Sequence, residues 1–266
     1  MYQKFFRLIY MSCILVFIPL LVNAELSTRD AWDNLKKLLE TGGYQVIGQE
    51  ITVGPDLSIK NVQISSEVDA QTDITFDIGS LDLTKNKDGF INISLPEEIY
   101  VQYLNEDEFG YKTEANILVR ARELDFKVSG KLSQVLYQLT ASSAGFALVE
   151  LLDNGVVSPD FSAEMEFALA DVNSTVRVAG VSTIEVTSLL SASGASVKGG
   201  LSLLSVPLKL NFQYVMNQLK SSSVSNEPKV SLDEDFELAL MEGFSSTSNF
   251  TFDTSEMSLN ATTPSG

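Results

Sequence analysis

Residues 74–95, ITFDIGSLDLTKNKDGFINISL, contain the pattern that decides the fold. Ile74, Phe76 and Ile78 alternate with polar residues, and apolar side chains return at the same spacing after residue 90. Alternation with a period of two predicts strands that have one buried face and one wet face. Between the two runs, Asn-Lys-Asp-Gly at residues 86–89 is typical of a tight turn. The stretch therefore predicts an antiparallel hairpin.

The same alternation extends in both directions from this hairpin, with turn residues roughly every ten to fourteen positions. It favours an antiparallel meander because such short connections leave no room for crossover helices. We expect a mainly β (α+β) protein built on one long meander sheet, with a bulge at Asn61. Residues 132–153 fit a helix and a strand equally well. The expected strands lie in residues 44–64, 74–83, 90–95, 99–104, 115–119, 124–128, 161–169, 174–180 and 200–203.

A helix is expected at residues 27–42, before the first strand. Ser27 or Thr28 can cap its start, and Gly42 or Gly43 can end it. Trp32 and the leucines at 35, 38 and 39 lie along one stripe at helical spacing. The polar face carries both signs of charge, which favours packing on the protein's own sheet over a membrane surface.

A similar order returns at residues 231–243, where a polar cap and acidic residues precede an apolar stripe and Gly243. Strand-like residues follow, so we expect a duplicated helix-plus-meander unit. The expected division is a leader at 1–24, a β-rich domain at 25–220, a linker at 221–230 and a second unit at 231–266. The second unit would need more strands to match the first, which indicates a truncated product.

The first 24 residues have the order of a secretory signal peptide. Lys4 and Arg7 precede an apolar run that is interrupted by Pro19 and shorter than a bilayer span. Small residues at the end predict cleavage between Ala24 and Glu25. An uncleaved anchor is the alternative, and a lipid attached at Cys13 is disfavoured by the residues before it.

The composition restricts the chemistry of the mature chain. Removing Lys4 and Arg7 from 18 basic residues leaves 16 against 35 acidic ones, a net charge of about −19 that disfavours nucleic-acid partners. The chain has no histidine, and its one cysteine leaves with the leader. We therefore expect no catalytic, cofactor or metal residues. The acidic clusters at 106–108 and 233–235 lack the ligand spacing of a calcium loop.

The leader, the segment AWDNLKKLLETGGYQVIGQEITVG at residues 31–54 and the segment LSIKNVQISSEV at residues 57–68 precede an acidic meander. In this order they resemble an uncharacterised family of periplasmic proteins from alphaproteobacteria that carry a domain of unknown function. The resemblance covers most of the mature chain. It implies a periplasmic location and a longer full-length protein, and it implies no activity and no site.

We expect an exported, acidic, cysteine-free envelope protein without catalytic activity, which binds a lipid or another apolar ligand or serves as a scaffold. The expected partner is such a ligand or an envelope protein. No membrane span is expected after cleavage. One alternative is a carboxylate-type enzyme acting on glycans, which would need two acids about 5 to 10 Å apart in a cleft. The other is a surface adhesion module that pairs through an edge strand.

Overall fold

The computed structural model describes residues 26–69, 71–157, 161–180, 184–203, 208–227, 241 and 244–262. The described elements are one helix followed by strands. They are α2 (Thr28–Thr41), β1 (Gln45–Val53), β2 (Asp56–Asp69), β3 (Thr72–Lys85), β4 (Ile91–Ser94), β5 (Glu98–Glu106), β6 (Lys112–Arg122), β7 (Asp125–Lys131), β8 (Gln134–Asp153), β9 (Val156–Val157), β10 (Phe161–Ala179), β11 (Ile184–Leu203), β12 (Leu208–Glu227), β13 (Ser245–Thr251) and β14 (Thr254–Thr262).

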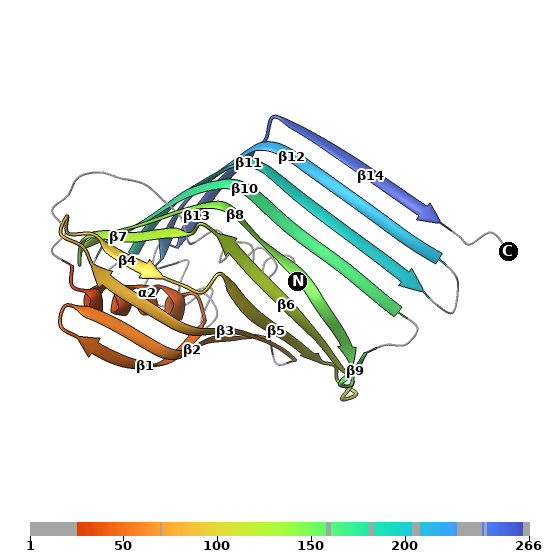
Figure 1. Ribbon diagram of the computed structural model, residues 1–266, viewed down its shortest axis with the longest axis horizontal. Helices are drawn as coiled ribbons and strands as arrows, with labels where there is room; N and C mark the ends of the chain where they lie inside the picture. The colour runs from red at the N-terminus through yellow and green to blue at the C-terminus, as the bar shows by residue number, and fades with distance from the viewer. Residues whose placement is uncertain are drawn as a thin grey trace.

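All of these strands belong to one antiparallel sheet of 14 strands, which confirms the mainly β fold class. The main path runs β1-β2-β3-β4-β7-β8-β10-β11-β12-β13. Beside it, β5 and β6 connect β3 to β8, and β14 pairs with β12. The sheet curves so that β1–β3 and the long strands β8–β12 lie on opposite sides of α2 (Figure 1).

The observed strands test three local expectations. The hairpin at residues 86–89 is confirmed, because β3 pairs with β4 across it. Residues 132–153, which were open between helix and strand, form β8 from Gln134 to Asp153. The linker expected from Ser221 is wrong up to Glu227, since these residues continue β12 and pair with β11 and β13. A run of serines is typical of a loop, but here paired strands on both sides hold it extended.

Helix α2 begins with a reciprocal capping box. The Ser27 hydroxyl accepts from the backbone N–H of Asp30, and the Asp30 carboxylate accepts from the Ser27 backbone N–H. Such a box satisfies donors that would otherwise have no partner in the first turn. The hydrogen bonds from Ser27 lower the pKa of the Asp30 carboxyl. The expected helix at 27–42 is thereby confirmed at both ends, with Gly42 as its C-cap.

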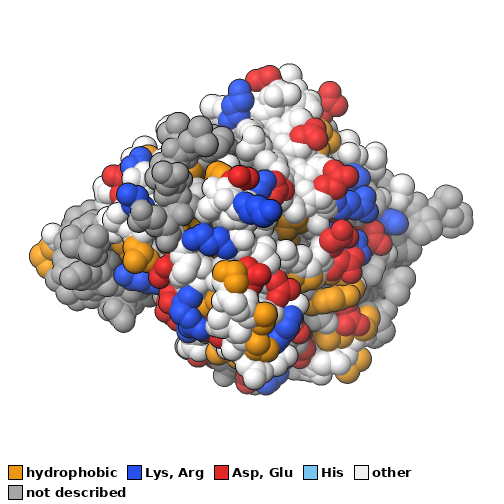
Figure 2. Space-filling model, turned by 60° about the vertical axis from the view of Figure 1, so that its left-hand side comes forward, with side chains coloured by type: hydrophobic (Ala, Val, Ile, Leu, Met, Phe, Trp, Pro, Cys, Tyr) orange, Lys and Arg blue, Asp and Glu red, His pale blue; other side chains and the backbone are white. Residues whose placement is uncertain are grey.

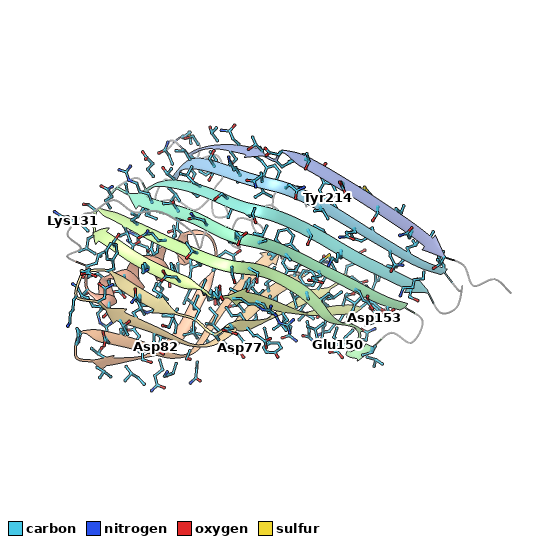
Figure 3. All side chains as sticks on the ribbon, turned by 45° about the horizontal axis from the view of Figure 1, so that its top comes forward. Asp77, Asp82, Lys131, Glu150, Asp153 and Tyr214 are labelled. Atoms are coloured by element: carbon cyan, nitrogen blue, oxygen red, sulfur yellow. The ribbon has the colours of Figure 1, made fainter. Side chains whose placement is uncertain are left out.

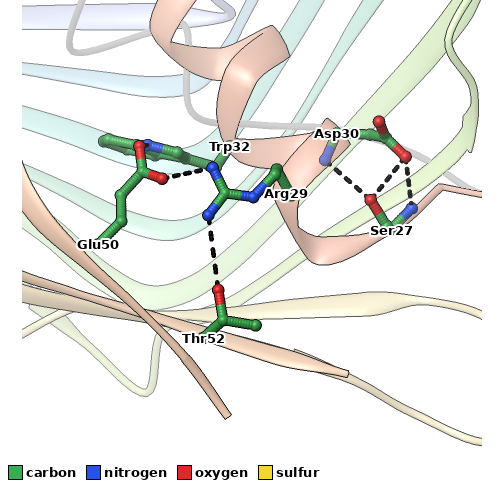
Figure 4. A network of polar contacts seen from close by, with 6 residues as sticks. All are labelled: Ser27, Arg29, Asp30, Trp32, Glu50 and Thr52. Carbon is green, nitrogen blue, oxygen red and sulfur yellow. Dashed lines mark hydrogen bonds and ion pairs between the residues drawn. The ribbon is translucent and has the colours of Figure 1, made fainter. Parts of the chain in front are cut away.

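One carboxylate fastens the helix to the sheet. Glu50 of β1 accepts a hydrogen bond from Trp32 Nε1 at 3.0 Å and forms an ion pair with Arg29 at 2.6 Å (Figure 4). The Trp32 side chain itself is only 2% exposed and belongs to the core. On the other side of the helix, Asn34 accepts a 2.7 Å hydrogen bond from the Tyr137 hydroxyl of β8. The helix is therefore tied to both sides of the curved sheet.

A crease crosses the sheet from β2 to β14. Asn61, Glu123, Asp171 and Gln218 have positive φ angles of 53°, 52°, 47° and 54°. In the paired strands β8, β10, β11 and β12, the residues at this line lack the regular pairing, and the same register resumes on both sides. At the same line β6 gives way to β7, and β13 gives way to β14. The bulge expected at Asn61 is confirmed, since the β2–β3 register shifts there.

The crease divides the sheet into two halves, and α2 lies on the inner face of one of them. We call this the covered half. Its inner rows, exemplified by Val135, Tyr137, Val176 and Val178, are buried. The other half, which we call the open half, contains β5, β6, β14 and the parts of β8, β10, β11 and β12 beyond the crease.

The last strands extend the same sheet. Both β13 and β14 pair with β12, one on each side of the crease. Of the helix expected at 231–243, only Met241 is described, and it is helical. The expected linker residues 228–230 also lie outside the described part. Whether 231–266 begins a second unit stays a prediction.

Candidate functional site

The inner face of the open half is the most distinctive surface of the described chain. Its central row crosses the sheet from β5 to β14, with each residue directly opposite the next. Every side chain in it is aromatic or aliphatic, and the rings of Phe146 and Phe167 stack with centroids 5.4 Å apart. The row consists of Ile99, Val119, Phe146, Phe167, Val197, Tyr214 and Met257.

The neighbouring rows repeat this composition. Toward the crease, Leu169 and Met216 pack against the core cluster, so the face is continuous with the core. Away from the crease, the ring of Phe212 lies across Gly199, where an added Cβ would stand 2.1 Å from a ring carbon. Glycine is thus required under this ring. Further apolar residues of the face are Val101, Ala115, Ile117, Ala144, Leu148, Leu151, Ala163, Met165, Ala195, Leu201, Leu210, Leu259 and Ala261. We call this whole surface the open face.

The strand alternation changes phase at the crease. In β10 the inward residues are Val172, Ser174, Val176 and Val178 on the covered side. On the open side Leu169 packs against the core and Phe167 continues its row. Asp171, whose φ angle is positive, lies between the two stretches and shifts the alternation by one residue. The kink therefore keeps apolar side chains inward along the whole strand.

No described helix covers the open face, because α2 packs mainly against β1, β2 and β3, and its hydrogen bond to β8 is made at Tyr137 in the covered half. Several of its large side chains are consequently exposed: 38% for Met165, 39% for Phe212, 65% for Leu259 and 72% for Met257. Tyr214 lies midway along the part of β12 that belongs to this face, while Glu150 and Asp153 lie at the far end of β8 (Figure 3). Apolar patches of this extent mark interaction sites on soluble proteins.

The opposite face of the same strands is mainly polar, with separate apolar side chains such as the paired Tyr100 and Leu118. In β10, β11 and β12 the outward residues include Glu166, Lys198 and Gln213, which lie opposite one another in register. At β5 and β6, Glu98 and Arg120 form an ion pair at 2.8 Å. On the side of the molecule drawn in Figure 2, acidic and basic side chains are likewise interspersed, with apolar ones scattered between them. The continuous apolar rows thus belong to one face of the open half.

Acidic residues gather mainly in turns and across strands. Asp107 accepts hydrogen bonds from the backbone N–H groups of Phe109 and Tyr111, and Glu106 pairs with Lys112 at 3.0 Å. The cluster at 106–108 therefore shapes a turn, and the cluster at 233–235 lies outside the described residues. Among the described residues, no group of three or more acids gathers where a metal ion could be held. The expected absence of a metal stays a prediction.

One carboxylate pair, the arrangement from which the expected alternative enzyme would start, lines a hollow of the described structure. Glu67 of β2 and Asp73 of β3 stand directly opposite each other, and both line a shallow hollow with Gln45, Ser65 and Gln102. Like charges placed opposite each other in a ladder are unfavourable. The hollow is open, and Leu104 is the one apolar residue among those that line it, whereas glycoside hydrolysis requires an apolar surrounding for one of its two acids.

The expected cleavage site at Ala24 and Glu25 lies outside the described residues. Within the described part, no helix combines the length and the apolar run of a membrane span. Comparison with protein-family models, curated proteins and solved structures gave no match. The open face is thus the feature of the described chain that points to a function.

Sequence reasoning did not identify this face. The strands at 99–104, 115–119 and 161–169 were expected, and each shows its own apolar alternation. What aligns them is the register, which joins residues as distant as Ile99 and Met257 in one row. A usable signal was that Phe161–Leu169 alternates apolar and polar residues out of phase with Val172–Val178.

Proposed function

We propose that this protein is a non-catalytic binding protein of the periplasm that holds the acyl chain of a lipid against its open face. The observation that carries the proposal is the uninterrupted apolar row from Ile99 to Met257, with polar side chains on the reverse face. Ligand sites are predominantly apolar with few polar groups. The scaffold alternative would be favoured by a polar face, and this face is apolar.

The dimensions of the face suit an acyl chain. The inward residues of β10 from Ala163 to Leu169 span about 20 Å at ~3.3 Å per residue. An acyl chain occupies about 15 Å, half of a bilayer's hydrocarbon core of ~30 Å. A whole chain therefore fits along the strands without leaving the apolar surface. Burial on both partners contributes roughly 25 cal/mol per Å² of apolar area.

The periplasmic location rests on the leader at residues 1–24 and on the resemblance described above, since the described structure begins at residue 26. A carrier in this compartment would shield an acyl chain from water between membranes. The carboxylate enzyme stays an alternative, and Glu67 and Asp73, which lie opposite each other, are the acids with which it could be tested.

The proposal is tested by binding of a neutral apolar dye, N-phenylnaphthylamine, and by mass spectrometry of lipid extracted from protein purified from the native periplasm. Val197→Lys places a charge in the middle of the central row, and we expect dye affinity to fall more than tenfold, roughly 1.4 kcal/mol. Ser196→Lys is the matched control because its side chain lies on the polar face of the same strand.

Ser196→Lys should bind the dye like the unmodified protein. Equal dye affinity in the two variants, with both folded by circular dichroism, contradicts the assignment of the open face as the binding surface. A sugar in place of lipid in the native extract would favour the glycan alternative.

A further inference from the structure

The two edges of the sheet differ in how well they are protected. Edge strand β1 has a register irregularity between Ile47 and Gln49, and its Glu50 is tied to α2. Bulges of this kind prevent another strand from pairing along an edge. Strand β14, at the other edge, pairs regularly with β12 along its whole length.

Within the described residues, which end at Thr262, strand β14 has few of the usual protecting features. Its sequence TSEMSLNAT contains one charged residue, Glu256, and neither proline nor lysine. All nine of its residues are exposed, and among the described strands it pairs with β12 alone. An exposed, regular edge with little charge is a template for a further strand. The open face ends at this edge with Met257 and Leu259 turned inward.

We propose that β14 is a dimerisation edge, at which the β14 strands of two copies of this chain pair antiparallel about a two-fold axis at Ser258. In this register Met257 of each copy lies opposite Leu259 of the other, which joins the two open faces. On the polar face Glu256 lies opposite Asn260, so no like charges meet. The strand is therefore complementary to itself, which is the requirement of a symmetric dimer.

A second copy fits this edge better than another edge of the same protein. Pairing of β14 with β1 of a second copy would have to absorb the irregularity at Gly48, where an added Cβ would stand 2.6 Å from Ile59. It would also leave a free edge at each end and so build an open polymer. Pairing of β14 with itself closes after two copies.

The interface is short, and the copies repel each other because the whole chain has a net charge of −17. Short interfaces are typical of weak, transient association. We expect a dimer with a dissociation constant on the order of 10 µM. Because salt screens the repulsion, the dimer should become stronger as ionic strength rises. This proposal goes beyond lipid binding and does not depend on it.

The test uses sedimentation velocity and single-cysteine crosslinking on the mature protein, which the expected cleavage leaves without a native cysteine. Residues directly opposite each other in an antiparallel ladder have Cα atoms about 4.5–5.5 Å apart, within the range that a disulfide bridges. Ser258→Cys should therefore give a covalent dimer on mild oxidation. Asn249→Cys, on exposed β13 at the same edge, is the matched control and should stay largely monomeric.

Charge variants test the register independently of oxidation. Ser258→Lys and Ser258→Asp each place like charges together at the axis, so each should weaken self-association more than tenfold. An equimolar mixture of the two should restore dimers. A monomer at all concentrations, equal crosslinking at 249 and 258, or no recovery in the mixture overturns the proposal. Dye binding measured on the same samples reports separately on the open face.

Discussion

The covered half and the open half of the sheet have similar inner faces but different neighbours. In the covered half Val135, Tyr137 and Val176 are at most 1% exposed, because the sheet closes around α2. In the open half Met165 and Phe212 remain 38% and 39% exposed. The same strands run through both halves. The difference shows that apolar residues are packed in the core in one half and remain partly exposed in the other, which supports the proposal that the exposed ones bind a ligand.

The largest expected effect concerns the helix that makes the halves unequal. Trp32→Ala removes the most bulky residue of α2 and leaves Glu50 without its indole donor, so we expect a loss of about 3–5 kcal/mol in unfolding free energy. Phe212→Ala is the counterpart in the open half and should cost less than half as much, since its ring is already 39% exposed. Urea unfolding followed by circular dichroism measures both.

If Trp32→Ala fails to fold, Trp32→Phe gives a measurable value. It keeps most of the packing and loses the hydrogen bond to Glu50, at a cost of about 1–2 kcal/mol. Equal costs for Trp32→Ala and Phe212→Ala would remove the distinction between the halves.

The helix and the individual strands were predictable from sequence because they depend on neighbours in the chain. Ser27 with Asp30, and Asn86 with Gly89, act within a few residues. The crease was not predictable at β10 and β12, because it uses Asp171 and Gln218, where no glycine signals a left-handed residue.

The covered half and the open half could not be distinguished from sequence either. Leu132, Val135, Leu136 and Leu139 have helical spacing, yet they belong to the turn before β8 and to β8 itself. Which rows are covered depends on where α2 docks, through contacts such as that between Asn34 and Tyr137, 103 residues apart. Only the register reveals that the remaining apolar residues form one surface.

A matched pair within β10 compares the halves directly. Val176→Thr keeps the shape of a fully buried side chain and adds a hydroxyl, which should cost about 1–3 kcal/mol. The neighbouring Ser174 and Thr175 oxygens already have no partner among the described atoms, so the new hydroxyl finds none readily. Thermal unfolding checks the value. A cost below about 0.5 kcal/mol would show that water reaches the covered half.

The capping box predicts how the covered half responds to acid. Ser27→Ala should cost about 1 kcal/mol at neutral pH. Because Ser27 lowers the pKa of Asp30 from 3.8, the contribution is present above that value and is lost as pH falls through the lower folded-state pKa. Unfolding at pH 7 and pH 2.5 should show the difference between variant and parent shrinking. Ser196→Ala, outside any cap, should show no such change.

The crease that separates the halves can be relaxed at one residue. Gln218 has a φ of 54°, which costs a residue with a side chain about 1–2 kcal/mol. Gln218→Gly removes this strain but adds about 0.5–1 kcal/mol of backbone entropy, so the net expectation is a stabilisation of up to about 1 kcal/mol. Gln213→Gly, in the regular part of the same strand, should be destabilising. A loss in both variants would mean that the crease is unstrained.

The smallest stability effect is expected in the middle of the open face. Met165→Thr replaces a side chain that is 38% exposed with a residue that favours strands, so we expect a change within about 0.5 kcal/mol. The same variant should lower the affinity for N-phenylnaphthylamine several-fold, because it removes apolar contact from the proposed acyl site. The substitution at Met165 would thus change binding with little change in stability, whereas Val176→Thr in the same strand would change stability.

Together, Met165→Thr and Val176→Thr test the difference between the two halves most directly. An exposed apolar side chain contributes little to folding and promotes aggregation, so a continuous surface of them needs a cause other than the fold. If Met165→Thr costs as much stability as Val176→Thr, the open face is part of the core and the proposed binding surface is lost. If it costs nothing and binding falls, the rows from Ile99 to Met257 are explained by the ligand that they hold.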